Sequence, residues 1–330
     1  MFSTPTVVGD VVYVGSCSGI LYALDRSSGQ VRWSHDVRPN GRPTSFHGDP
    51  VVIDSMLVIG TDGGTVDSTF GEIYAFDLAS GRALWKHSTT DGIVSDVCRA
   101  GDRVLAITRA DSLLCLDAAS GQLGWSFRGG GPIYPVAFRS PAVAGGRVFI
   151  GGSDGSVRAL EVGSGRLLWT RDLRDHISTG ILAMGDALYL GAGDGEIYRL
   201  RQDDGEVEAR LTVGGATFGP PTPVGDSLIV LAGERSLVCV DRSLLRLRWR
   251  QGLSEGLSSS RPYVWRGSVL AGTEAGELLA FRASDGLPLW SHALQGVIRG
   301  IGMSDRVLYV GTLKGFVYAC ARLALPLGRR

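Results

Sequence analysis

The side chains best placed to hold a ligand are ionisable groups that precede short apolar runs. They stand one to three residues ahead of such a run: His47, Asp49, Asp96, Arg139, Arg261 and Arg299. Carboxylates and guanidinium groups that converge on one place could bind an anionic or zwitterionic group in a polar pocket. The alternative is a hydrated channel in which these charges pair with one another and with water. If they form a binding pocket, Asp96→Ala and Arg261→Ala are expected to leave thermal stability nearly unchanged.

A metal site is the second chemistry to consider. The segment TDGGTVDSTFGE (61–72) carries Asp62, Asp67 and Glu72, whose oxygens could coordinate Ca²⁺. Their spacing matches no EF-hand loop, and Gly, Asp and Ser are normal in a surface turn. Three histidines occupy one repeat position on different strands and are not expected to share a metal: His35, His87 and His292. We therefore predict no metal site.

Motifs that mark covalent or phosphoryl-transfer chemistry are missing from the sequence. It contains no G-x-S-x-G elbow, no phosphate-binding loop and no HExxH pair. The five cysteines are scattered, which argues against paired zinc ligands and against a disulfide framework. The sequence thus predicts a protein that is not an enzyme.

The ionisable groups owe their positions to a repeat. The stretch YALDRSSGQVRW (22–33) returns as YAFDLASGRALW (74–85), and YALD-like segments occur eight times at intervals of about 40 residues. Each copy reads as four short β-branched or aromatic runs separated by Gly-, Asp- or Ser-rich turns. Units of four antiparallel strands at this period stack radially as blades. We predict one all-β domain over residues 1–330, an eight-bladed β-propeller of four-stranded antiparallel blades, with the ionisable groups at the mouth of its central channel.

Two residue types recur at fixed places in the copies. A glycine stands in the turn between the third and fourth strands, where it can take a positive φ. Four residues later, six of the eight copies have a tryptophan: Trp33, Trp85, Trp125, Trp169, Trp249 and Trp290. We expect each indole to seal the gap to a neighbouring blade. Ala209 and Arg329 replace it in the other two copies, so those junctions are expected to be weaker.

The last copy is the least regular. It ends ARLALPLGRR (321–330), with Pro326 and no tryptophan, so its fourth strand is expected to be poor or missing. Either the ring closes imperfectly or the sequence is a piece of a longer protein. An unclosed last blade would leave FVYAC (316–320) as an exposed apolar edge.

The charge balance limits the partners. The chain has 33 basic and 33 acidic residues, so its formal net charge is zero, which argues against a nucleic-acid partner and a polybasic membrane anchor. No apolar run is long enough for a transmembrane helix, and no signal peptide is visible. The expected location is the cell envelope or periplasm if a signal lies upstream, and the cytoplasm otherwise.

The pattern Y-A-L-D-x-x-S-G-x-x-x-W, anchored at Tyr22, Asp25, Gly29 and Trp33, resembles the repeat of the pyrroloquinoline-quinone-like (PQQ-like) β-propellers over essentially the whole chain. That family contains quinoprotein dehydrogenases and a non-catalytic branch, which includes the lipoprotein of the outer-membrane β-barrel assembly machinery. The dehydrogenases use a vicinal cysteine pair, a stacked tryptophan and Ca²⁺, whereas no two cysteines here are adjacent.

The resemblance therefore implies the non-catalytic branch. The expected protein is a scaffold without a cofactor, PQQ included, which presents its loops and channel mouth to a protein partner. The alternative left open is a ligand-sensing accessory domain of a larger protein, with a small molecule in the channel. A PQQ-dependent dehydrogenase is the reading that the cysteines disfavour.

Overall fold

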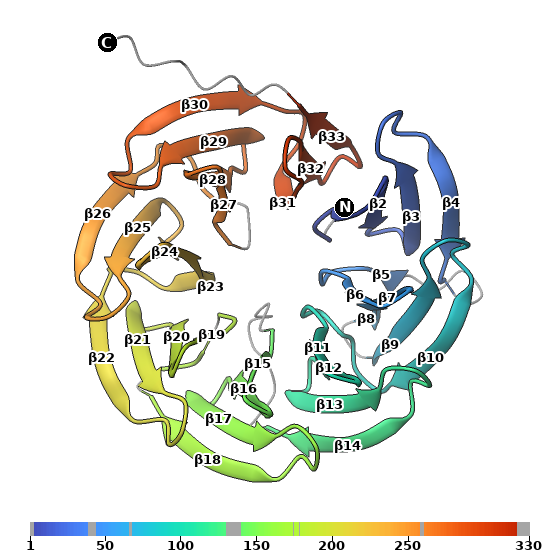
Figure 1. Ribbon diagram of the computed structural model, residues 1–330, viewed down its shortest axis with the longest axis horizontal. Helices are drawn as coiled ribbons and strands as arrows, with labels where there is room; N and C mark the ends of the chain where they lie inside the picture. Colours follow the sequence, from blue (N-terminus) through green and yellow to red (C-terminus); the bar gives the residue numbers. More distant parts are fainter. Residues whose placement is uncertain are drawn as a thin grey trace.

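Eight β-sheets stand around a central axis (Figure 1). The computed structural model describes residues 3–38, 44–65, 68–129, 140–173, 175–177, 179–257 and 261–321. Each sheet is one blade, and its repeat strands follow one another from the axis to the rim in chain order. Blades 1 to 7 have four such strands, and blade 8 has three in the described part of the chain. The predicted all-β, eight-bladed propeller is confirmed.

The strands of each blade run from axis to rim as follows. Blade 1 has β1 (Thr6–Val8), β2 (Val11–Gly15), β3 (Ile20–Asp25) and β4 (Val31–Asp36). Blade 2 has β6 (Val51–Ile53), β7 (Met56–Gly60), β9 (Ser68–Asp77) and β10 (Ala83–Thr89), extended by β5 (Thr44–Ser45) and β8 (Asp62–Thr65). Blade 3 has β11 (Cys98–Ala100), β12 (Arg103–Ile107), β13 (Ser112–Asp117) and β14 (Leu123–Arg128).

The remaining blades repeat the pattern. Blade 4 has β15 (Ala142–Ala144), β16 (Arg147–Gly151), β17 (Ser156–Glu161) and β18 (Leu167–Asp172). Blade 5 has β19 (Leu182–Met184), β20 (Ala187–Gly191), β21 (Glu196–Arg201) and β22 (Val207–Thr212). Blade 6 has β23 (Thr217–Val224), β24 (Ser227–Ala232), β25 (Ser236–Asp241) and β26 (Leu247–Gly252). Blade 7 has β27 (Tyr263–Trp265), β28 (Ser268–Gly272), β29 (Glu277–Arg282) and β30 (Pro288–Ala293), and blade 8 has β31 (Ile298–Met303), β32 (Leu308–Thr312) and β33 (Val317–Cys320).

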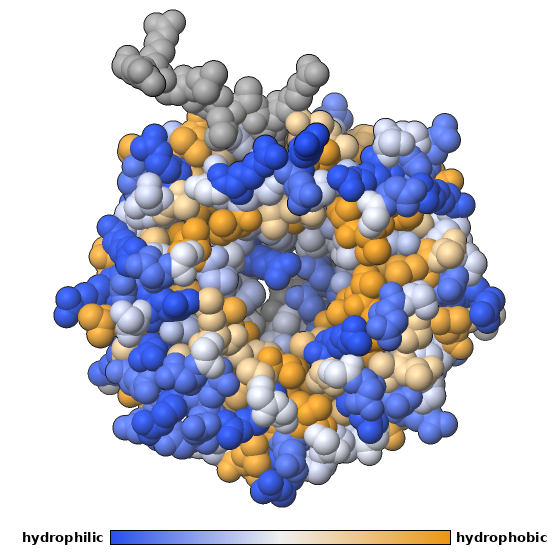
Figure 2. Space-filling model, in the orientation of Figure 1, coloured by the Kyte–Doolittle hydropathy of each residue, from blue (hydrophilic) through white to orange (hydrophobic). Residues whose placement is uncertain are grey.

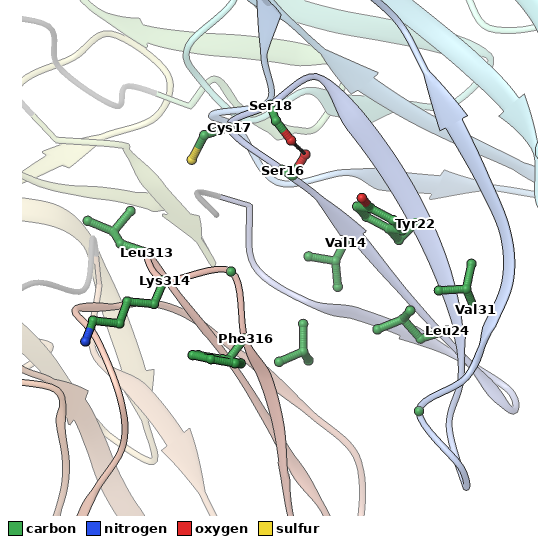
Figure 3. Close-up of a pocket in the computed structure, with 13 residues that line it drawn as sticks. Val14, Ser16, Cys17, Ser18, Tyr22, Leu24, Val31, Leu313, Lys314 and Phe316 are labelled. Carbon is green, nitrogen blue, oxygen red and sulfur yellow. Dashed lines mark hydrogen bonds between the residues drawn. The ribbon is translucent and has the colours of Figure 1, made fainter.

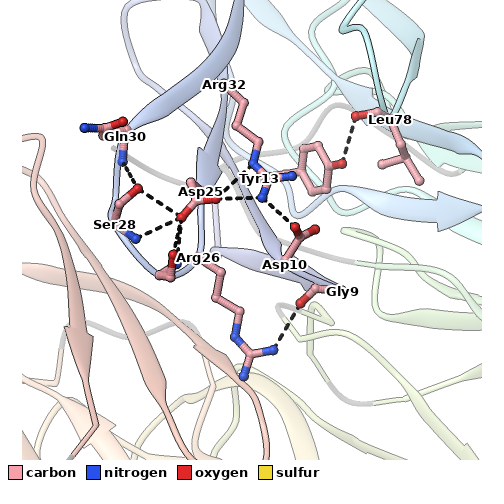
Figure 4. A network of polar contacts seen from close by, with 10 residues as sticks. Gly9, Asp10, Tyr13, Asp25, Arg26, Ser28, Gln30, Arg32 and Leu78 are labelled. Carbon is pink, nitrogen blue, oxygen red and sulfur yellow. Dashed lines mark hydrogen bonds and ion pairs between the residues drawn. The ribbon is translucent and has the colours of Figure 1, made fainter.

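The turn between the third and fourth strands explains the Asp and Ser of the repeat. In blade 1 the Asp25 carboxylate accepts hydrogen bonds from the backbone N–H groups of Ser27 and Ser28, at 3.0 and 2.9 Å. Arg32 then bridges Asp25 and Asp10, at 2.6 and 2.5 Å (Figure 4). Hydrogen bonds from Ser27 above all, and then from Arg32, lower the pKa of Asp25. The ionised carboxylate therefore fixes the turn.

A β-bulge accompanies each third-to-fourth strand pairing at the tryptophan position. In blade 1, Ala23 pairs with Trp33 and Leu24 pairs with Val31, so Arg32 is the extra residue. Trp33 reaches the next blade, where its Nε1–H donates to the carbonyl oxygen of Leu78 at 3.1 Å. Five tryptophans make this bond to the following blade, which confirms their predicted role: Trp33, Trp85, Trp125, Trp169 and Trp249.

The glycine of the repeat lies against the tryptophan of the preceding blade. Gly81 has a φ of 68°, as predicted, but a Cβ there would also lie 2.4 Å from the indole of Trp33. At five junctions this distance is between 2.4 and 2.6 Å, closer than a Cβ can approach. The glycine is thus required for its backbone conformation and for the space it leaves, and the sequence indicated only the first reason.

The junction between blades 5 and 6 is filled by different residues. Ala209 stands at the tryptophan position, and Leu245 stands at the glycine position of the next blade. Leu245 has a φ of 49° and is 2% exposed, and it packs in one apolar cluster with Ala209. The bulk missing from one blade is supplied by the next, so the side chain that would leave a gap here has a replacement.

Blades 8 and 1 meet closely near the axis and less closely toward the rim. A Cβ at Gly300 would lie 2.5 Å from the Cα of Thr4, and one at Gly302 would lie 1.9 Å from the carbonyl oxygen of Pro5. Among the described residues, the apolar cluster at this junction has three buried members, against ten at the junction of blades 1 and 2. The expected irregularity of the last blade is therefore present in the described part.

Candidate functional site

Loops that lead from the rim of one blade to the axis of the next meet at the mouth of the central channel. Thr4 precedes β1, Asp49 precedes β6, Asp96 precedes β11 and Arg261 precedes β27. Figure 2 shows the ring hollowed at its centre, with hydrophilic surface inside the hollow. The ionisable groups of the repeat are thus positioned by strand starts, which a rigid ring holds in place.

Two carboxylates link successive blades at this mouth. The backbone N–H of Thr4 donates to Asp49 Oδ1 at 2.6 Å, and the backbone N–H of Asp49 donates to Asp96 Oδ1 at 2.7 Å. The Ser140 hydroxyl donates to the other oxygen of Asp96, at 2.8 Å. Blades 1 to 4 are therefore joined by a continuous chain of hydrogen bonds. These carboxylates are committed to protein groups, which sequence reasoning did not foresee.

Arg261 approaches the same carboxylates from blade 7. Its Nη2 lies 3.5 Å from Asp49 Oδ2, and its guanidinium carbon lies 5.3 Å from the centre of the Tyr263 ring. The Tyr263 hydroxyl is 3.3 Å from the hydroxyl oxygen of Thr4. Because 40% of the Arg261 side chain is exposed, this group also faces solvent.

Burial, and then the neighbouring charge of Asp96, raise the pKa of Asp49 to about 6. The positive charge of Arg261 and the hydrogen bond from Thr4 act in the opposite direction and are outweighed. Two carboxylates that share one site resist being ionised together. The mouth therefore contains a carboxyl group that titrates near neutral pH.

A second charged group lies on the insertion of blade 2. Asp62, on β8, is 7% exposed and lies between His47 Nδ1 and Arg109 Nη1, each 3.4 Å from one of its oxygens. A Cβ at Gly92 would be 1.7 Å from Asp62 Oδ1, so the carboxylate fills the space that this glycine leaves. The insertion is thus fixed to blades 2 and 3 by its own aspartate.

The remaining carboxylates of the insertion do not form a metal centre with Asp62 in the described ranges. Glu72 Oε1 accepts a hydrogen bond from Lys86 Nζ at 2.8 Å and from the Ser88 hydroxyl at 3.4 Å. Asp67 lies outside the described residues. Within the part of the chain that is described, no group of three or more His, Cys, Asp or Glu side chains is placed to hold a metal ion.

Hydroxyl groups two residues ahead of the inner strands prove to be structural. Ser3 accepts from the N–H of Gly15 at 2.7 Å, and Thr179 accepts from the N–H of Gly191 at 3.1 Å. Ser95 donates to the carbonyl oxygen of Ile107 at 3.2 Å. Each buried hydroxyl anchors its loop to the second strand of the same blade. These side chains are therefore unavailable to a ligand.

The structure brings together three of the six predicted mouth residues: Asp49, Asp96 and Arg261. His47 belongs instead to the group around Asp62. Arg299 is half-buried on β31, and Arg139 lies outside the described residues. Sequence reasoning missed Arg109 and Tyr263, although Tyr263 is two residues beyond Arg261 and Asp62 lies in the one long insertion. Hydrogen bonds between loops 47 residues apart leave no mark in a single sequence.

The thiol nearest this site is poorly suited to chemistry. Burial, and secondarily the charge of Asp96, raise the pKa of Cys98 to about 11. A thiol with such a pKa remains protonated at neutral pH and is a weak nucleophile. The exposed guanidinium groups of Arg261 and Arg109 are better suited to donating hydrogen bonds to carboxylates or backbone carbonyls of a bound molecule.

The ring, its repeat and its mouth define a PQQ-like β-propeller. The chain belongs to the family described as outer membrane protein assembly factor BamB, whose sequence profile matches residues 2–68, 69–242 and 214–320. The predicted resemblance to the assembly branch is therefore confirmed. No helix among the described residues is long and apolar enough to cross a membrane.

Individual relatives agree with this assignment. The outer membrane protein assembly factor BamB of Burkholderia pseudomallei (strain K96243) is 29% identical over 251 residues, which are 71% of this chain and 62% of that protein. The quinohemoprotein alcohol dehydrogenase ADH IIB of Pseudomonas putida is 28% identical over 199 residues, 60% of this chain but 24% of that enzyme. The crystal structure of BamB from Moraxella catarrhalis superposes with a TM-score of 0.81 at 21% identity, covering 96% of this chain and 95% of that one.

The chain thus spans about three fifths of the length of the curated relatives that it matches first. Those relatives are assembly factors rather than enzymes, and the dehydrogenases share the propeller at lower coverage.

Proposed function

We propose that this protein is a non-catalytic scaffold in the assembly of outer-membrane proteins and that the loops at the channel mouth bind another protein of the assembly apparatus. The observation that carries the proposal is the hydrogen-bond chain through Asp49 and Asp96. It holds the loops of four blades in one arrangement, so little conformational entropy is lost when a partner binds. Membership of the assembly-factor family supports the biological setting.

Recognition is expected to rely on the guanidinium groups that remain in contact with solvent. The Arg261 and Arg109 side chains are 40% and 34% exposed, and both lie beside buried carboxylates that orient them. Arginine is enriched in protein interfaces, and its planar fork suits carboxylate partners. The partner surface that this mouth favours is therefore acidic at its centre.

The proposal is tested by capture from the solubilised envelope of the organism of origin. The bait is the protein itself, compared with Arg109→Gln and Arg261→Gln variants. Arg166→Gln is the matched control, because its side chain is 66% exposed at a turn on the opposite face. We expect an assembly component to be retained by the wild type and the control and to be reduced at least tenfold by the mouth variants. Equal capture by all four proteins would exclude the mouth as the docking face.

We further propose that the protein acts on the envelope side of the cell and requires no cofactor. Incubation with PQQ and Ca²⁺ should change neither its absorption spectrum nor its inability to oxidise alcohols with a dye acceptor. A quinone absorption band that remains with the protein after gel filtration, together with turnover, would assign it to the dehydrogenase branch. Protease treatment of intact and osmotically opened cells then tests the location.

A further inference from the structure

A groove of about 530 Å³ opens between blades 8 and 1, toward the rim (Figure 3). Blade 1 forms one wall with side chains of β2, β3 and β4, and blade 8 forms the other with the β32–β33 turn and the start of β33. The apolar lining residues are Val14, Tyr22, Leu24, Val31, Leu313 and Phe316. Val31 and Phe316 are 56% and 46% exposed, so the groove is an uncovered apolar surface.

The groove occupies the place that a fourth strand takes in the other blades. In blades 1 to 7 the third strand pairs with a fourth, and the small residue of the third strand faces the tryptophan position, as in Ala23↔Trp33 and Ala159↔Trp169. In blade 8 the third strand, β33, pairs with β32, and its corresponding residue is Ala319. Within the described residues, the second edge of β33 has no paired strand.

The groove also contains an unused seat for an indole. At five junctions the repeat glycine lies directly against the tryptophan of the preceding blade. Gly29 is the equivalent residue facing blade 8; it has a φ of 71° and nothing lies within 4 Å of where its Cβ would be. At those five junctions the indole N–H donates to the carbonyl of the residue after the repeat aspartate, and here that residue is Arg26. The receiving half of the contact is therefore already formed on blade 1.

Residues 1–330 do not themselves supply an aromatic side chain for this seat. The spacing of the repeat places Arg329 at the tryptophan position of the last copy. Trp265, on β27, donates instead to the carbonyl oxygen of Ser304 at 3.1 Å. Arg26 bonds across the junction to the hydroxyls of Tyr309 and Ser304, at 3.0 and 3.1 Å, and so holds blades 8 and 1 together beside the groove rather than filling it.

We propose that the groove binds an extended segment of another protein, which adds to β33 as an antiparallel strand and carries a tryptophan opposite Ala319. The indole lies over Gly29 and donates to the carbonyl oxygen of Arg26. Strand addition satisfies the open edge through main-chain hydrogen bonds, and the aromatic pocket provides the specificity. The site extends the interface by which the blades already bind one another. It lies on the rim and does not depend on the function proposed for the mouth.

The test uses a peptide taken from the protein's own repeat. SGRLLWTRDL (164–173) contains the outer strand of blade 4 with its tryptophan, and the same peptide with Trp169→Ala is the control. Each is titrated into the intact protein by calorimetry. We expect one binding site for the tryptophan peptide and at least tenfold weaker binding of the alanine peptide, because a buried aromatic anchor carries much of the affinity of such interfaces. Equal binding of the two peptides, or no binding at millimolar concentration, would refute the proposal.

Matched variants of the protein locate the site. Gly29→Asn keeps a residue that tolerates positive φ but places its side chain in the seat, and should weaken binding at least tenfold. Gly185→Asn is the control, since Gly185 has a φ of 64° and nothing within 4 Å of its Cβ position in blade 5. If Gly29→Asn binds like the control, the seat is not used. If the outer amides of β33 are already protected from hydrogen exchange without peptide, the protein's own chain fills the groove and the proposal fails.

Discussion

The exchanged residues at the junction of blades 5 and 6 allow a quantitative test of how the blades pack. Leu245→Gly removes a side chain that is 2% exposed, and Ala209→Trp adds an indole where Leu245 already lies. Truncating a buried leucine costs about 2 to 5 kcal/mol, and relief of the left-handed backbone returns about 1 to 2 kcal/mol. We therefore expect Leu245→Gly to lower the free energy of unfolding by about 2 kcal/mol.

Ala209→Trp alone is expected to be similarly harmful. At the five regular junctions an added Cβ on the glycine would lie only 2.4 to 2.6 Å from the indole, so a leucine and an indole cannot share this space. Overpacking of this kind costs about 1 to 3 kcal/mol. The double variant restores the pair found elsewhere in the ring, and its stability should return to near that of the wild type. The coupling energy between the two sites should then be about 2 to 3 kcal/mol.

The assay is urea unfolding of the four proteins, followed by fluorescence and circular dichroism. Leu244→Gly is the control, because Leu244 is 58% exposed beside Leu245 and its loss should cost no more than about 1 kcal/mol. If the double variant is destabilised by the sum of the two single changes, the residues at this junction do not substitute for a tryptophan and a glycine, and our account of the repeat is wrong.

Three further predictions concern the mouth and the repeat. Asp96→Ala should cost about 1 to 3 kcal/mol in urea unfolding, because it removes the acceptor for the Asp49 N–H and the Ser140 hydroxyl, whereas Asp96→Asn should cost less; equal stability of Asp96→Ala and the wild type would return us to the expectation from sequence. Asp49, with its pKa raised to about 6, binds its proton more tightly in the folded chain than in the unfolded chain, so its contribution to the free energy of unfolding falls by up to about 3 kcal/mol as the pH rises from about 4 to about 6. Asp49→Asn should abolish that decline relative to the wild type, and parallel pH profiles of the two proteins would contradict the assignment. Gly121→Ala should lower the melting temperature more than Gly101→Ala, since both have positive φ but only Gly121 lies against a tryptophan, Trp85; equal shifts would mean that the indole contact is unimportant.

The sequence was sufficient for the architecture because the architecture is local. Each blade is a run of short strands joined by turns, so the spacing of Asp25, Gly29 and Trp33 specifies the hairpins and repeats with them. Short-range rules also predicted the positive φ of the repeat glycines and the reach of the tryptophans. The number of blades then followed from the number of copies, and the imperfect last blade from the missing tryptophan.

The site was less predictable because its contacts cross between blades. The column of residues at the mouth could be aligned, but not the fact that Asp49 and Asp96 accept hydrogen bonds from neighbouring loops. The same limit applies to Ala209 and Leu245, which lie far apart in the repeat pattern and meet only in space. For this reason the expectation that Asp96→Ala is harmless must now be replaced by its opposite.

The contact of Gly300 and Gly302 with the first described residues of blade 1 has a mechanical consequence. A circle that is fastened at its hub and parted at its circumference behaves like a split washer: it can widen or narrow slightly without tearing any hydrogen-bonded sheet. Such breathing concentrates at a single slit, while the other seven seams, each plugged by side chains, move together as one arc.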